Sequence, residues 1–483
     1  MFWRGVWGYL PANIVQGVVG FLAIVIFTRV LSPADFGRYA LAFSVMTLAH
    51  VAVFSWLEAA MARFWAAEQT AEGLARHFAS LYRTAFRLGL VFLPVAAVLI
   101  ALWPMDMAFR IAVAVGVGGI PVRCFAKLAM ERFRAAGEVG RAARIDMITA
   151  IGGLAIGVAV ALAGAGGSAP LIGLMLAPLL TLPFILPGEL KQGRGARVDR
   201  TRLRTYAVYG YPIAASLALA VVLSSTDRFL LAAFMNEAAV GAYHAGYSLA
   251  NRTLDVLFIW LGAAGTPALV MALERGGGER LQTAAREQAS TFLLIGLPAA
   301  AGVALVAGPL TEVMIGEDLR RVAASITPWI ALSALLSGLT TYYFHQAFTL
   351  GRRTGLLLAA MAVPALANIV LNLLLIPGHG VMGAAWSTAI SFGLGLIASI
   401  AIGRRVLVMP VPWETLARCG LATAAMALAV SVLPRLGGLV ELMLQATVGA
   451  LVYAVVALTL NAAGVRDVAG RLLATARTRR ALS

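Results

Sequence analysis

The stretch TRVLSPADFGRYALAFS, residues 28–44, brings two arginines, an aspartate, a proline and a glycine together inside a strongly apolar chain. Ser32 can cap a helix, Pro33 fits the first helical position, and Asp35 can reach back to the cap. The sequence therefore predicts that one helix ends near Arg29 and that the next begins at Ser32. Because both flanks are apolar, we expect a tight hairpin at the outer side of a membrane.

A second copy of this pattern occurs in NEAAVGAYHAGYS, residues 236–248, where Asn236 stands in place of the capping Ser32. Three further positions match: Gly37 with Gly241, Tyr39 with Tyr243, and Ser44 with Ser248. FSWLEAAMAR (54–63) then aligns with FIWLGAAGTP (258–267), and AAGEVGRAAR (135–144) with TLGRRTGLLL (349–358). These matches predict two six-helix halves in a parallel repeat, followed by two extra helices.

Composition excludes a soluble protein, because 61% of the 483 residues are hydrophobic, 12% are charged, and the mean hydropathy is +0.87. Apolar runs of about 20 residues recur throughout, the length that crosses a bilayer as a helix. We therefore predict an all-α membrane protein of about 14 transmembrane helices. The expected helices begin near residues 8, 37, 81, 108, 144, 168, 206, 238, 288, 325, 354, 380, 411 and 437. No connection between them is long enough for a folded domain.

The basic residues predict the topology, because cytoplasmic connections of membrane proteins are rich in Lys and Arg. With a cytoplasmic N-terminus, most of the 38 Lys and Arg residues fall on the inner side, including a run from Arg123 and Lys127 to Arg144 that we assign to an inner connection. Both termini are therefore predicted to be cytoplasmic. The expected parts are an N-terminal lobe (1–205), a C-terminal lobe (206–405), two additional helices (406–465) and a basic cytoplasmic tail (466–483).

Three stretches in this order resemble polysaccharide flippases, the O-antigen and exopolysaccharide repeat-unit translocases of the multidrug/oligosaccharidyl-lipid/polysaccharide exporter superfamily. They are the hairpin at 28–44, DRFLLAAFMNEAAVGAYHAGYSLA at 227–250, and NIVLNLLLIPGHGVMGAAWSTAIS at 368–391. The resemblance covers nearly the whole chain. It implies a bacterial inner-membrane protein that carries a polyprenyl-diphosphate-linked oligosaccharide from the inner to the outer leaflet by alternating access. It also implies membrane lipids as partners, with H⁺ or Na⁺ as a coupling ion and a polysaccharide polymerase as further candidates.

Charged side chains inside spans cost roughly 2.5–3.5 kcal/mol each at mid-bilayer, so they should face a cavity or pair with one another. Arginine suits phosphate geometry, which makes four arginines candidates for contact with the headgroup: Arg29, Arg63, Arg228 and Arg252. Candidates for ion coupling or for pairing are Glu58, Asp227, Asp255 and His345, and candidates for sugar contact are Asn13, Gln16, Asn368 and Asn372. The alternatives are a self-neutralising Arg252–Asp255 pair, an Arg29 that reaches the interface, and hydrogen bonds between helices for the amides.

Two other transport functions compete with this interpretation. A multidrug/cation antiporter shares the superfamily but should carry embedded carboxylates without an excess of arginine. A flippase for a lipid-linked peptidoglycan precursor is chemically closer. An enzyme is disfavoured, because the sequence holds no D-x-D, H-E-x-x-H or G-x-S-x-G motif and its five histidines lack ligand spacing. We therefore expect no metal, no cofactor and no nucleic-acid partner, although the net charge is +16.

Overall fold

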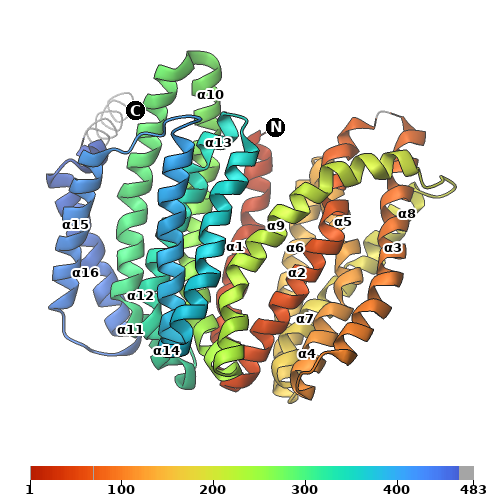
Figure 1. The fold of residues 1–483 in the computed structure, drawn as a ribbon, viewed down its shortest axis with the longest axis horizontal. Helices are drawn as coiled ribbons and strands as arrows, with labels where there is room; N and C mark the ends of the chain where they lie inside the picture. The colour runs from red at the N-terminus through yellow and green to blue at the C-terminus, as the bar shows by residue number, and fades with distance from the viewer. Residues whose placement is uncertain (1, 69, 467–483) are drawn as a thin grey trace, which may run out of the picture. The chain divides into compact units, whose positions relative to one another are not determined.

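The computed structural model describes residues 2–68 and 70–466, with side chains from residue 11 onward except at Thr354 (Figure 1). Within these ranges the protein has sixteen α-helices, several short 3-10 or π segments, and no strand. The predicted all-α fold is therefore confirmed. The predicted basic tail lies outside the described residues, apart from Arg466.

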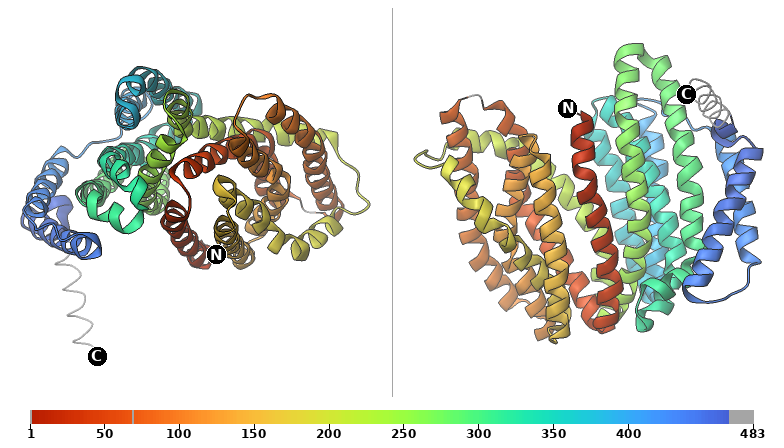
Figure 2. Two further views of the ribbon diagram at one scale, coloured as in Figure 1. Left: turned by 90° about the horizontal axis from the view of Figure 1, so that it is seen from below. Right: turned by 180° about the vertical axis from the view of Figure 1, so that it is seen from behind.

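The first compact unit contains residues 1–244. Its helices are α1 (Phe2–Val30), α2 (Pro33–Phe64), α3 (Ala71–Leu102), α4 (Met107–Gly118), α5 (Ile120–Ala135), α6 (Val139–Leu162), α7 (Ala169–Leu176), α8 (Leu182–Gln192) and α9 (Arg200–Phe234). Within this unit α2 packs along α9, α4 and α5, and α1 lies beside α6 (Figure 2).

The second compact unit begins at residue 245, inside α10 (Glu237–Leu305). It also contains α11 (Ala307–Met314), α12 (Glu317–Leu339), α13 (Gln346–Leu350), α14 (Thr354–Gly403), α15 (Trp413–Ser431) and α16 (Gly438–Thr459). Here α12 packs on α14, and α15 packs on α16. Packing thus groups α9 with the first unit, whereas the boundary at 205/206 rests on the repeat in the sequence and stays a prediction.

The helix starts at both copies of the hairpin pattern are capped as the sequence predicts. The Ser32 Oγ accepts a hydrogen bond from the Asp35 N–H (3.1 Å) and donates one to the Asp35 carboxylate (2.7 Å). At the second copy, the Asn236 side chain accepts from the Ala239 N–H at 2.9 Å. Each side chain satisfies a backbone donor that the first helical turn leaves without a partner.

Two of the long helices reverse at a glycine, where the backbone adopts positive φ. Gly277 interrupts α10 at φ 65° and ψ −161°, and Gly380 interrupts α14 at φ 55° and ψ −132°. Figure 1 shows the two arms of α10 side by side. An L-residue with a Cβ rarely adopts such angles, so glycine makes a turn without a separate loop possible.

The number of membrane helices agrees with the sequence prediction. Ten helices of the described chain are long and apolar enough to cross a membrane, and a pair bent by 56° (Gly166–Leu180 with Leu182–Gln192) makes eleven. Since α10 and α14 each supply two arms, these spans and α15 give the fourteen expected helices. The start expected near residue 81 is wrong, because α3 begins at Ala71.

Candidate functional site

A charged cluster lies inside the spans formed by α2 and α5. The His50 Nε2 lies 2.8 Å from a Glu58 carboxylate oxygen, and the Lys127 Nζ lies 3.7 Å from the other oxygen. The side chains of His50 and Glu58 are only 6% and 13% exposed, whereas that of Lys127 is 39% exposed. The cluster therefore connects a buried carboxylate with a cation that reaches the surface of the unit.

Arg123 adds a second cation to the same cluster. It lies one helical turn before Lys127 on α5, so both side chains project from one face. The Arg123 Nη1 and the His50 Nδ1 are buried, and neither has a hydrogen-bond partner among the described residues. Two cations thus accompany one carboxylate, and the buried donor has unused capacity for an anion.

The sequence predicted only Glu58 from this cluster. Arg123 and Lys127, which the sequence analysis places in an inner connection, are helical and lie within the stretch Met107–Ala135 that is long and apolar enough to cross a membrane. Their position toward the inner side stays a prediction, because an arginine in the last turns of a span looks the same in sequence as one in a loop. The i,i+4 spacing of Arg123 and Lys127 is the sequence feature that indicates that both side chains lie on one face of a helix.

Arg228 and Asp227 lie near the end of α9 and are buried inside the first unit, 8% and 2% exposed. The Asp227 carboxylate accepts hydrogen bonds from the Arg228 N–H (2.9 Å) and from the Tyr243 hydroxyl. The Arg228 Nη1 donates to the Ser44 Oγ on α2 at 3.2 Å. In this conformation Arg228 therefore connects α9 to α2, and its predicted contact with a headgroup stays a prediction.

The other candidates in the first unit lie at exposed positions. Arg29 closes α1 and donates to the Val25 carbonyl at 2.7 Å, which keeps its guanidinium close to its own helix. Arg63 is exposed in the last turn of α2, with its guanidinium carbon 5.9 Å from the centre of the Phe64 ring. Asn13 and Gln16 are exposed on α1.

In the second unit, no contact within ion-pair distance joins Arg252 to Asp255, and the roles expected of both residues stay predictions. Asp255 instead accepts a hydrogen bond from the Asn251 amide at 2.5 Å, one turn earlier, and Arg252 is exposed. An i,i+3 spacing permitted the ion pair, but Asn251 lies at the competing i,i+4 position.

The remaining polar candidates of the second unit have hydrogen-bond partners within that unit. His345 follows the π-helical turn Thr340–Phe344, and its Nε2 lies 3.2 Å from the Ser399 Oγ. Asn372 donates to Asn368 at 2.9 Å, and both amides are buried. This bond joins two turns of α14, so it does not link two helices. No group of three metal-binding side chains occurs in the part of the chain that the structure describes.

The fold and its long apolar helices define a multi-pass α-helical membrane protein, and comparison with solved structures agrees. The lipid II flippase MurJ, in an inward closed conformation, superposes with a TM-score of 0.74 at 13% identity, over 95% of this chain and 99% of MurJ. An inward-facing multidrug resistance transporter of the MATE family, from the MOP superfamily, gives a TM-score of 0.63 at 16% identity, over 80% and 94% of the two chains. These likenesses confirm the predicted superfamily fold.

The family follows from the sequence. A family model described as "Polysaccharide biosynthesis protein" matches residues 26–324, which is more than half of the chain. The chain therefore belongs to this polysaccharide biosynthesis family, as the resemblance predicted. No sequence among the curated proteins matches it.

Proposed function

We propose that the protein carries a polyprenyl-diphosphate-linked oligosaccharide from the inner to the outer leaflet of the bacterial cytoplasmic membrane by alternating access. Both termini are then cytoplasmic. The family match supports a role in polysaccharide biosynthesis, and the fold supports a flippase of the MOP superfamily. A sugar diphosphate cannot cross about 30 Å of hydrocarbon unaided, so the pathway needs polar groups inside the membrane.

The observation that carries the proposal is the excess of positive charge around Glu58. Embedded charges are expensive, and Arg123 and Lys127 together exceed the one carboxylate near them. The unused Arg123 donor is suited to a phosphate oxygen, because guanidinium groups form short charge-assisted hydrogen bonds with phosphates. The His50–Glu58 pair offers a place where a proton can be exchanged during the cycle, which makes H⁺ the favoured coupling ion.

Two alternatives predict different cargo. A multidrug/cation antiporter would move an organic cation, for which an excess of arginine is unfavourable. A lipid-linked peptidoglycan precursor also carries a diphosphate, and the likeness to MurJ favours it as the second candidate. Because both lipids present the same phosphate chemistry to Arg123, only a comparison of substrates separates them.

The test is transport by the purified protein in proteoliposomes. A fluorescent polyprenyl-diphosphate oligosaccharide is loaded in one leaflet, and its appearance in the other is followed with a membrane-impermeant quencher. We expect wild-type protein to accelerate movement, and Arg123→Gln to slow it by about tenfold or more, the loss typical of one charge-assisted hydrogen bond. Arg141→Gln is the matched control, because Arg141 is an exposed cation paired with Glu138 at 2.6 Å.

Three outcomes contradict the proposal. If the labelled lipid moves between leaflets no faster than in protein-free vesicles, the protein is not a flippase for this substrate. Movement of a peptidoglycan precursor alone assigns the second candidate. Exchange of a cationic dye for protons, without movement of lipid, assigns the antiporter.

A further inference from the structure

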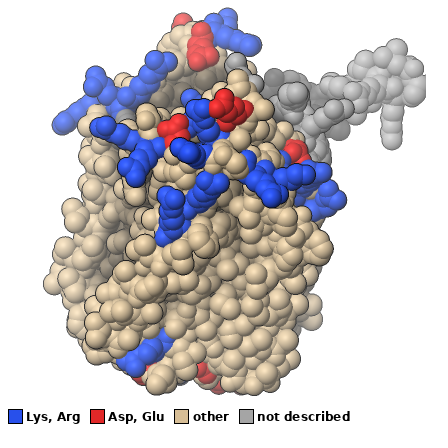
Figure 3. Space-filling view, turned by 90° about the vertical axis from the view of Figure 1, so that its right-hand side faces the viewer, with Lys and Arg blue, Asp and Glu red and all other residues tan. Residues whose placement is uncertain are grey.

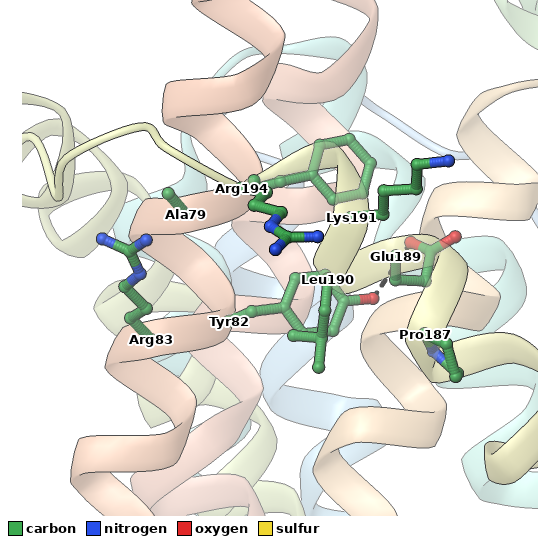
Figure 4. A pocket seen from close by; sticks show the side chains of 10 residues that line it. Ala79, Tyr82, Arg83, Pro187, Glu189, Leu190, Lys191 and Arg194 are labelled. Carbon is green, nitrogen blue, oxygen red and sulfur yellow. Dashed lines mark hydrogen bonds between the residues drawn. The ribbon is translucent and has the colours of Figure 1, made fainter.

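A pocket of about 500 Å³ opens between α3 and the end of α8 in the first unit. Figure 4 shows its polar wall, formed by Tyr82 and Arg83 on α3, Glu189 and Lys191 on α8, and Arg194 in the turn that follows. Buried Phe78 and Tyr82 stack at 6.0 Å and form an apolar floor. The pocket thus combines an aromatic base with three basic side chains.

The one acidic residue of the pocket is already occupied. The Glu189 side chain is 1% exposed and accepts hydrogen bonds from the Tyr82 hydroxyl (3.1 Å) and from the Arg132 Nε (3.0 Å). Its charge is therefore balanced by Arg132, which does not line this pocket. Glu189 fixes α8 against α3 and α5 and leaves the basic side chains of the pocket without a counter-ion.

Arg83, Lys191 and Arg194 are exposed, and none forms an ion pair or a side-chain hydrogen bond with any residue that the structure describes. In Figure 4 the guanidinium groups of Arg83 and Arg194 lie on one side of the Tyr82 ring, and the Lys191 chain extends on the other. Three cations around one hollow favour an anion with several acceptor oxygens, which is the chemistry of a phosphate ester.

The turn that carries Arg194 is held tightly against α3. A Cβ at Gly193 would lie 2.8 Å from the Ala79 N and 3.1 Å from its Cα, so only glycine permits this approach. Gly195 then adopts φ +81°, which returns the chain toward α9. The position of Arg194 beside Tyr82 is therefore built into the backbone and does not depend on its flexible side chain alone.

The pocket lies next to an exposed apolar surface of α3. Beyond Arg87 this helix exposes a continuous apolar face, with Leu90 58%, Val91 65% and Leu99 61% exposed. Arg83 lies two turns before Leu90, so the pocket is about 10 Å from the start of this face. Figure 3 shows Lys and Arg crowded at one end of this side of the molecule, with few charges elsewhere. Basic side chains next to an apolar surface are typical of the level at which anionic headgroups meet a membrane protein.

We propose that the pocket binds the phosphate of an anionic membrane phospholipid, with an acyl chain lying along the apolar face of α3. The site is separate from the charged cluster on α2 and α5, and the inference does not depend on the transported substrate. The lipid would bridge α3 and the α8 turn and stabilise the first unit.

The test is native mass spectrometry of the detergent-purified protein after addition of phosphatidylglycerol or phosphatidylcholine. We expect phosphatidylglycerol to bind more tightly, and Arg83→Gln with Arg194→Gln to lower its affinity by about fivefold for each guanidinium removed. The matched control is Arg141→Gln with Arg144→Gln, because these arginines line a neighbouring cavity of about 580 Å³ in which Arg141 already pairs with Glu138. The control should keep wild-type affinity at the same net charge.

Competition identifies the source of the phosphate. Glycerol phosphate and inorganic phosphate at millimolar concentration should not displace the lipid, because they lack the acyl chain. Displacement of the lipid by either compound would show that the pocket is a site for soluble phosphate and would contradict the proposed lipid site. Displacement of phosphatidylglycerol by polyprenyl diphosphate at equal concentration would assign the pocket to the substrate pathway. This result would also contradict the proposed phospholipid site. Equal affinities for phosphatidylglycerol and phosphatidylcholine would contradict the proposed site. Wild-type affinity of the variant with Arg83→Gln and Arg194→Gln would contradict it as well.

Discussion

Gly37 and Gly241 lie against each other in the first unit, although they occupy equivalent places in the two copies of the repeat. A Cβ on Gly37 would overlap the carbonyl group of Glu237 and lie 3.0 Å from the Gly241 N. A Cβ on Gly241 would overlap the Pro33 carbonyl oxygen and lie 3.0 Å from the Gly37 N. The first turns of α2 and α10 therefore cross backbone to backbone, a close approach that small residues permit in membrane helices.

This crossing predicts that Gly37→Ala destabilises the protein. The added methyl group meets rigid backbone, and overpacking of this kind costs about 1–3 kcal/mol. Thermal unfolding in detergent should show a lower midpoint. Gly17→Ala is the control, because no atom lies within 4 Å of a Cβ at that helical position. Equal midpoints for the two variants would contradict the close approach.

Glu189 is predicted to be important for stability. Glu189→Gln leaves Arg132 without its buried partner, and breaking a buried ion pair in this way costs about 3–5 kcal/mol. The exposed fraction of the Glu138 side chain is 35%, and this residue also pairs with Arg132, so Glu138→Gln serves as the control and should cost much less. The measurement compares the thermal unfolding midpoints of the two variants. Similar decreases in midpoint would show that the burial of Glu189 contributes little to stability.

Arg228→Ala is predicted to abolish surface polysaccharide in cells while the amount of protein stays normal. Arg228→Lys should keep part of the activity, because an ammonium group can still donate toward Ser44. Ser44→Ala separates a role of Arg228 in transport from its role in connecting α9 to α2, because this variant removes the partner on α2 but keeps the guanidinium group. If Arg228→Ala produces wild-type polymer at normal expression, Arg228 has no part in transport. A lower protein level in that variant would assign Arg228 to folding.

Asp199 is predicted to make the start of α9 sensitive to acid. Its carboxylate caps the helix by accepting from the Arg202 and Thr201 N–H groups, and the bond from Arg202 contributes most to lowering its pKa. A lowered pKa in the folded state means that the stabilisation is complete above the pKa of the unfolded chain and is lost as pH falls through the folded pKa.

The corresponding measurement follows thermal unfolding of Asp199→Asn and of the wild type between pH 7 and pH 3. Asparagine also caps helices but does not titrate, so the variant should lose less stability on acidification than the wild type. Glu72→Gln is a suitable control, because Glu72 is an exposed acid whose side chain is 75% accessible. Parallel pH curves for wild type and Asp199→Asn would exclude a role for this carboxylate.

Local features of the fold were predictable from the sequence, and distant pairings were not. Ser32 and Asn236 carry their capping partners within three residues, and the second arm of α14 begins at Gly380, where a helix start was expected. Arg132 and Glu189 lie 57 residues apart on different helices, so no spacing rule connects them.

The candidate site shows the same limit. The sequence identifies Glu58 as a charge within a span, but it does not reveal that Arg123 of α5 lies near this carboxylate, because the two residues are 65 positions apart on different helices. For Asp255 the sequence leaves two neighbours within reach, Arg252 three residues before it and Asn251 four residues before it, and the hydrogen bond in the structure comes from the Asn251 amide. Which neighbour forms a hydrogen bond with the carboxylate depends on side-chain rotamers and burial, and the sequence pattern contains neither.

Gly277 has a consequence for the sidedness of the whole C-terminal part. A straight helix of the 69 residues in α10 would be a rod of about 104 Å, more than three times the hydrocarbon thickness of a bilayer. The reversal at this single achiral residue returns the chain to the face from which it came. A residue that could not adopt these angles would oppose the return, so the alternation of the later crossings relies here on a backbone conformation that glycine permits.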